Sequence, residues 1–335
     1  MNRNKLKLKP YPLQLGGEYK CSVLNVNTGE ERDLTGWFSN LITDVGLDNV
    51  GQTGGRTSIC QIGTGTGAPS FSDTALQAPV ASTGTVSSTT SESGGSATPG
   101  NNWHQWSKTF QFAQSLEGNF TELGISNSAH TNVGAVLWSR ELIRDSQGNP
   151  TTITVLEDEI LQVTYRLRMY FPLEDIIGQV NIAGVDYDYI LRRCLDSAGE
   201  HWAAGGQAGG QAGIYTSTPS SSGRVPARAY SGDISAGANL PDGPSSIRSS
   251  GVTVAYEPGS LERLATLIWG LTAANFELGL RSIVYTTLST AASSAAAGNG
   301  WGAYQIQFDP PIPKDNTLIF EITVGISWAR YAPPE

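Results

Sequence analysis

A strict alternation of apolar and polar residues marks one stretch near the middle of the chain. Within Thr151–Phe171, every second residue from Leu161 onward is apolar, and the residues between them include Arg166 and Arg168. Side chains along a strand point alternately to the two faces of a sheet, so the stretch is predicted to be one long strand with a buried face. An amphipathic helix would instead place the two arginines among the apolar residues.

The same alternation returns near the end of the sequence, where apolar residues recur from Leu318 to Trp328. Charged turns at 157–159 and 314–316 precede the two alternating runs. Two half-buried strands need partners for their apolar faces and for their backbone hydrogen bonds. We therefore expect an all-β fold, an antiparallel, jelly-roll-like β-sandwich with long Gly/Ser-rich loops and at most one or two short helices.

Shorter apolar segments bounded by turn residues predict the remaining strands. They cover positions 19–26, 58–62, 106–112, 120–125, 133–143, 176–193, 275–288 and 304–308. Two segments stay open between alternatives: 41–50 fits a short helix or an extended loop, and 260–271 fits a short helix or a strand. Prolines at 310, 311 and 313 predict an extended corner before the last strand.

Composition divides the chain into four parts. The segment 81–102 is low in complexity and predicts an exposed loop or a short hairpin, and 203–250 is mostly Gly, Ala, Ser, Pro and Gln. A long stretch of the second kind is usually functional or wraps another surface. The expected parts are an N-terminal arm with the first strand (1–35), the first part of the sandwich (36–175), a loop-rich insertion (176–251) and the C-terminal strands of the sandwich (252–335).

The overall charge argues against nucleic-acid binding. The 335 residues include 39 glycines, only 15% are charged, and the net charge is −9. Nucleic-acid-binding proteins present a basic patch or stripe. The basic residues that do cluster lie at the start of the chain, where we expect a flexible or docking arm: Arg3, Lys5, Lys7 and Lys9.

Location is predicted from what the sequence lacks and from its cysteines. No run of about eighteen apolar residues predicts a membrane helix, and the first residues do not resemble a signal peptide. Cys21, Cys60 and Cys194 are odd in number and widely spaced. We expect free thiols in a protein made in a reducing cytoplasm.

Motifs for catalysis, metals or cofactors are not found. Gly63-Thr-Gly-Thr-Gly67 lacks the spacing and the Lys-Ser/Thr pair of a phosphate-binding loop, so a turn is expected there. The three histidines, at 104, 130 and 201, are isolated and lack the spacing of a zinc site. We expect no catalytic residue, no metal and no cofactor.

Two groups of side chains keep alternative interpretations. Asp186 and Asp188 lie on one face of a predicted strand, as a calcium site or a glycosidase pair requires, although solvated turn charges are the simpler reading. Tyr187, Tyr189 and Trp202 could form a surface or glycan contact, or could be core aromatics.

Several phrases, taken in order, resemble the virion structural proteins of tailed bacteriophages, described as tail, tail-fibre or tail-tip components. An Asn149-Pro150 turn follows the fourth phrase, and the resemblance spans most of the chain except 199–250. The phrases are GWFSNLITDVGL (36–47), IGTGTGAP (62–69), ELGI (122–125), LWSRELIR (137–144), FDPPIPK (308–314) and ISWAR (326–330).

The resemblance implies a non-catalytic virion protein, assembled in the bacterial cytoplasm and associated with the tail as a fibre or tip component for host attachment. Expected partners are further copies of the chain, with a trimer preferred, other virion proteins, and a receptor or glycan on the host surface. One alternative is a capsid decoration or a collar and tail joint without host contact. Another is a glycan-cleaving tail protein using Asp186 and Asp188, although no parallel β-helix repeats are found.

Overall fold

The all-β expectation is confirmed: the chain forms a sandwich-like fold of several, mostly antiparallel sheets. The structure is a computed structural model, and one helix, α1 (Asp44–Thr53), lies among the residues that it describes. It describes residues 2–53, 57–93, 103–172, 174–193, 227–234, 240–285 and 304–332.

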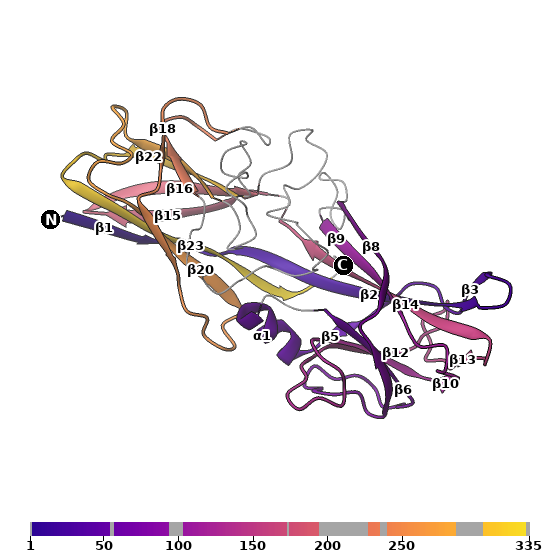
Figure 1. The fold of residues 1–335 in the computed structure, drawn as a ribbon. Helices are drawn as coiled ribbons and strands as arrows, with labels where there is room; N and C mark the ends of the chain where they lie inside the picture. Colours follow the sequence, from indigo (N-terminus) through magenta and orange to yellow (C-terminus); the bar gives the residue numbers. More distant parts are fainter. Residues whose placement is uncertain are drawn as a thin grey trace.

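One sheet, here called the long sheet, extends through the whole molecule (Figure 1). Its main path follows the order β19-β20-β23-β2-β14-β9-β8, with β1 beside β23, and β3 and β4 beside β2. These strands are β1 (Asn2–Lys7), β2 (Tyr11–Asn25), β3 (Glu31–Asp33), β4 (Phe38–Ser39), β8 (Val86–Ser93), β9 (Trp103–Gln111), β14 (Glu159–Tyr170), β19 (Ser250–Thr253), β20 (Glu262–Trp269) and β23 (Leu318–Arg330).

Two smaller sheets cover different halves of the long sheet and make two sandwiches (Figure 1). The first cover sheet contains β5 (Leu41–Ile42), β6 (Ile59–Gly63), β7 (Pro79–Thr83), β11 (Glu122–Ser126) and β12 (Leu137–Leu142). The second contains β15 (Ile176–Ile182), β16 (Val185–Arg193), β17 (Ala227–Tyr230), β18 (Ser245–Ile247), β21 (Leu280–Tyr285) and β22 (Tyr304–Ile312).

Buried aromatic residues join each cover sheet to the long sheet. In the first sandwich the Tyr19 hydroxyl lies 2.8 Å from Ser139 Oγ across the interior. In the second, the rings of Tyr11 and Tyr304 have centroids 5.1 Å apart. Tyr11, Tyr19 and Tyr304 belong to one continuous cluster of buried side chains, so the two sandwiches share a core.

The alternating runs form the strands that they predict, with one correction. Along β14 and β23, apolar residues are buried at nearly every second position. The expected single strand over 151–171 is interrupted, because β13 (Ile153–Val155) turns away to pair with β10 (Gly118–Phe120). The Glu159 amide donates to the Leu156 carbonyl at 3.0 Å, which closes the turn between β13 and β14.

The start of the chain is a strand of the long sheet rather than a flexible arm. β1 pairs in parallel with the first half of β23, and β2 pairs in parallel with the second half. Leu6 and Leu8 are buried, and burial of their side chains fixes the segment in place. These two pairings are parallel, within a fold whose sheets are mostly antiparallel.

The open alternatives are resolved by the neighbours of each segment. Residues 41–50 begin as β5 and continue as α1, whereas 260–271 contain the strand β20, which pairs with β19 and β23. The expected loop or hairpin at 81–102 contributes to β7 and β8, and its last part lies outside the described residues. Pro310 and Pro311 lie inside β22, where its register with β21 shifts, a position at which a strand tolerates proline.

The described part of the expected insertion, 176–251, contributes strands to both layers of the second sandwich. β15 and β16 form a hairpin, and β16 pairs with β22 from the C-terminal region. β17 pairs with β21, and β19 joins the long sheet. Side chains from 176–193 and from 304–312 therefore share one core, because pairing within a sheet brings these distant segments together.

Candidate functional site

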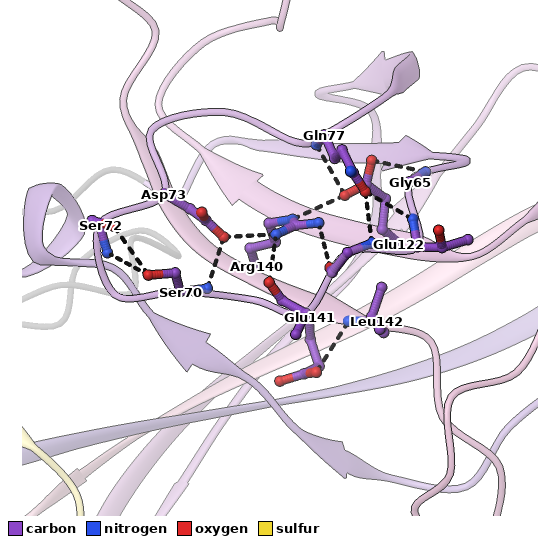
Figure 2. A network of polar contacts seen from close by, with 12 residues as sticks. Gly65, Ser70, Ser72, Asp73, Gln77, Glu122, Arg140, Glu141 and Leu142 are labelled. Carbon is purple, nitrogen blue, oxygen red and sulfur yellow. Dashed lines mark hydrogen bonds and ion pairs between the residues drawn. The ribbon is translucent and has the colours of Figure 1, made fainter.

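Three of the phrases that carry the phage resemblance meet around two buried charges in the first sandwich (Figure 2). Glu122 starts β11, Arg140 lies in β12, and the glycine-rich loop 63–69 leaves β6. The Arg140 Nε donates to Glu122 Oε2 at 2.9 Å, and the two side chains are 4% and 0% exposed. This Glu122–Arg140 network is the most completely buried ion pair among the described residues.

The Glu122 carboxylate also accepts hydrogen bonds from backbone amides of the glycine-rich loop and of the segment just before β7. Gly65 N and Ala78 N donate to Oε1 at 3.1 and 2.7 Å, and Gln77 N donates to Oε2 at 3.1 Å. The loop amides of Thr66 and Gly67 donate to the Gln77 Oε1. A buried carboxylate is tolerated when its lone pairs are satisfied in this way.

The other side of the guanidinium closes the same loop. Arg140 Nη1 donates to Asp73 Oδ2 at 2.7 Å, and Nη2 donates to the Gly67 carbonyl at 2.9 Å. Burial alone would lower the pKa of Arg140, but the carboxylates of Asp73 and Glu122 outweigh burial and raise that pKa above its usual value. The guanidinium therefore stays charged and holds the loop by its fork of donors.

Two glycines are required here because the carboxylate approaches the backbone closely. A Cβ at Gly63 would lie 2.6 Å from Glu122 Oε1, and a Cβ at Gly65 would lie 2.5 Å from the same atom. Close packing against Glu122 thus explains glycine at 65, and together with the Ala78 carbonyl, 2.5 Å from a Cβ at Gly63, it explains glycine at 63. The sequence predicted a turn here rather than a phosphate-binding loop. The geometry agrees, because the Gly65 amide already donates to Glu122, and the amides of Thr66 and Gly67 already donate to Gln77.

A second group of motif residues fixes α1 against the first cover sheet. The Thr43 hydroxyl donates to the Leu137 carbonyl at 2.5 Å, and the Gly46 amide donates to Thr43 Oγ1 at 2.9 Å. Trp138 Nε1 donates to Asn49 Oδ1 at 3.2 Å. Thr43 therefore acts at the start of the helix, where the first amides lack helical partners.

The same helix connects the first sandwich to the second. Trp328 Nε1 in β23 donates to the Leu47 carbonyl at 2.9 Å. The Tyr256 hydroxyl, which lies between β19 and β20, donates to Asp48 Oδ1 at 2.7 Å, and burial followed by this carboxylate raises the pKa of Tyr256 to about 12. We call this set of contacts the α1 junction.

The phrase before β23 supplies a buried lysine. Lys314 is 4% exposed, and its Nζ donates at 2.8 Å to both the Gly270 carbonyl and Asn275 Oδ1. Burial lowers the pKa of Lys314. Lys314 thus ties the turn after β20 to the corner before β23.

The motif residues described so far all form hydrogen bonds or ion pairs that connect one structural element to another. Comparison with protein-family models, curated proteins and solved structures gives no match to this chain.

The expected docking arm has partners within the chain. Arg3 Nε lies 2.8 Å from Glu321 Oε2, and Lys7 Nζ lies 3.9 Å from Glu262 Oε1. Lys5 and Lys9 are exposed. A docking role for these residues stays a prediction, now through the surface of β1 rather than through a free arm.

The tyrosines proposed for glycan contact are core residues. Tyr187 and Tyr189 are 5% and 3% exposed and face the interior of the second sandwich, because alternate residues of β16 point inward. Their surface role is corrected accordingly, and Trp202 lies outside the described residues. Asp186 and Asp188 lie on the exposed face, where they accept bonds from Asn181 Nδ2 at 2.6 Å and Gln179 Nε2 at 2.9 Å.

Other expected features concern metals, membranes and thiols. In the part of the chain that the structure describes, no three His, Cys, Asp or Glu residues are placed to hold a metal ion. No helix in the same ranges is long and apolar enough to span a membrane. Cys21 and Cys60 are buried free thiols, and burial raises the pKa of Cys21 to about 12.

An arginine and aromatic strip on the outer face of the long sheet was not predicted. Arg166 lies over the Trp37 ring, with its Cζ 3.9 Å from the centroid, and Arg168 lies over Trp103 at 4.5 Å. Glu18 forms ion pairs with both arginines. The alternation of β14 indicates that the arginines face outward, but their aromatic partners come from distant segments that sequence spacing does not identify.

Proposed function

We propose that this chain is a non-catalytic structural protein of a tailed-bacteriophage virion, associated with the tail as a fibre or tip component that contributes to host attachment. The proposal includes assembly in the bacterial cytoplasm, self-association with a trimer as the preferred state, and contacts with other virion proteins. The host partner would be a surface receptor or a glycan.

One observation carries this proposal: residues in the phrases that resemble phage virion proteins make contacts that hold separate structural elements together. The Glu122–Arg140 network closes the first cover sheet, the α1 junction connects the two sandwiches, and Lys314 fixes the corner before β23. That the residues of these phrases serve to hold the fold together supports a structural role for the protein. A long sheet that runs through both sandwiches gives the same support, since no linker separates them.

The test is to locate the protein on particles. An antibody raised against the purified chain would be applied to intact virions of the source phage and visualised by gold-label electron microscopy. Label at the distal tail is the expected result, and binding of the purified protein to host cells would then be measured. Label on the head or neck would refute the attachment role and favour a decoration or joint protein. Absence of label, with the chain also absent from the virion proteins by mass spectrometry, would refute the virion assignment.

A further inference from the structure

β15 is an edge strand without the usual protection against pairing. It bonds to β16 on one side, and no described strand pairs with its other side. Its sequence, IIGQVNI, contains no charged residue and no proline, and its register with β16 is regular over all seven residues. Natural proteins protect exposed edges with charges, prolines or bulges, because unpaired backbone groups are a template for another strand.

The backbone groups at the open edge follow from the hairpin geometry. Ala183 and Gly184 have positive φ angles and form a two-residue turn, so the flanking pair Ile182–Val185 is hydrogen-bonded. Hydrogen-bonded and non-bonded pairs alternate along an antiparallel ladder. The groups that point away from β16 therefore belong to Ile177, Gln179 and Asn181, and no described residue forms a backbone bond to them.

We propose that β15 pairs with β15 of a second copy of this chain, antiparallel, about a two-fold axis at Gln179. In this register Gln179 meets Gln179 of the partner subunit, and Ile177 meets Asn181 of the partner subunit. Each outward N–H and C=O then finds a partner, whereas other registers leave some of them unpaired. Ile177, which is 74% exposed, and the half-buried Val180 would lose solvent contact.

A second copy fits the edge because β15 is neutral and presents no like charge to itself. The acidic residues near the edge are Asp186 and Asp188 on β16, and Glu174 and Asp175 just before β15, where Asp175 is paired with Arg192. In the proposed register, positions 174 and 175 lie opposite the turn at 183–184 of the partner subunit rather than opposite each other. Across the paired edge, each β16 and its symmetry mate would be three strand spacings apart, or about 14 Å. Exposed charges at that separation are largely screened at about 0.1 M salt, where the Debye length is about 10 Å. The acidic rows therefore do not oppose self-pairing.

Substitution of Gln179 tests the contact without disturbing the fold. Gln179→Lys places two ammonium groups opposite each other at the axis, and Gln179→Pro removes an N–H that the β15–β16 ladder does not use. Sedimentation equilibrium should give wild-type particles with an even number of 35.5 kDa chains, so that trimers formed through other surfaces would pair through β15 into hexamers. Both variants should halve the mass of the particle. Gln147→Lys, in an exposed turn of the first sandwich, is the matched control and should leave the mass unchanged.

The register is tested by disulfide cross-linking with Cys194 replaced by serine. Directly opposite residues of a hydrogen-bonded pair have Cα atoms about 5.5 Å apart, within the range for a disulfide. Gln179→Cys should therefore form a linked dimer on mild oxidation. Asn181→Cys should not, because the two copies of residue 181 would be about 14 Å apart, four residues along the strands.

Hydrogen exchange separates self-pairing from coverage within one chain. The amides of Ile177, Gln179 and Asn181 should exchange slowly in the wild-type protein and rapidly in Gln179→Lys. The proposal is overturned by a monomeric wild-type protein, even with protected amides, because another segment of the same chain would then cover the edge. It is also overturned if Gln179→Lys keeps the wild-type mass, as a trimer built through other surfaces would. None of these results depends on a role in a virion.

Discussion

Replacing Arg140 by methionine is the most direct test of the Glu122–Arg140 network. The substitution keeps an unbranched side chain of similar length but leaves the Glu122 carboxylate buried without its cation. Glu122 retains three backbone amide donors, so its charge is only partly uncompensated. Breaking a buried ion pair by removing one partner costs about 3–5 kcal/mol. We expect the lower end, about 3 kcal/mol of unfolding free energy.

The assay is urea unfolding followed by tryptophan fluorescence, because eight tryptophans are spread along the chain. The midpoint should fall while the slope m stays constant, as it does when only stability changes. The double variant Glu122→Gln/Arg140→Met removes the buried charge and keeps an oxygen acceptor for the loop amides. It should recover roughly 1–2 kcal/mol relative to Arg140→Met alone.

Two results would refute this reasoning. If Arg140→Met costs less than about 1 kcal/mol, the pair behaves like an exposed salt bridge and the network does not hold the loop. If the double variant is no more stable than Arg140→Met, the loss comes from packing rather than from the unpaired carboxylate.

Three further predictions concern single positions. Gly65→Ala should lower unfolding free energy by about 1–3 kcal/mol because its Cβ would meet Glu122, whereas Gly36→Ala, which meets nothing within 4 Å, should change it little; chemical denaturation compares them. Tyr256→Phe removes the bond to Asp48 and should cost about 1.5–3 kcal/mol, with faster amide exchange in α1. Burial raises the pKa of Tyr165 to about 12 from 10.0, so unfolding free energy should fall between pH 10 and 12, where the unfolded state loses this proton first; Tyr165→Phe should reduce that fall by up to about 2.7 kcal/mol.

Period-two patterns predicted strands well where each strand has one buried face. In β14, burial of alternate residues follows the sequence from Leu161 onward. The same signal was present at Lys5-Leu6-Lys7-Leu8-Lys9, which alternates strictly, and the structure buries both leucines. There the high charge led to the prediction of an arm. Charged residues indicate which face of a strand is exposed to solvent, but the alternation still predicts a strand.

Strands buried on both faces gave weaker signals. All six residues of β12 are buried, including Ser139, Arg140 and Glu141, so polarity there marks internal partners rather than solvent. The partner of Arg140 could not be identified from sequence because Glu122 and Asp73 lie 18 and 67 positions away. A charged residue inside an apolar strand, together with a glycine repeat elsewhere, is the available hint that a buried pair exists.

The parallel pairing of the first and last strands has a mechanical consequence. β1 and then β2 follow β23 along its whole length in the same direction, from Asn2 beside Leu318 to Leu15 beside Arg330. Tension between the chain before Asn2 and the chain after Arg330 would pull the two sides of this seam in opposite directions along the strand axis. Such a load is shared by many hydrogen bonds at once instead of opening them one by one. We therefore expect high resistance to stretching along this axis, which single-molecule pulling can measure.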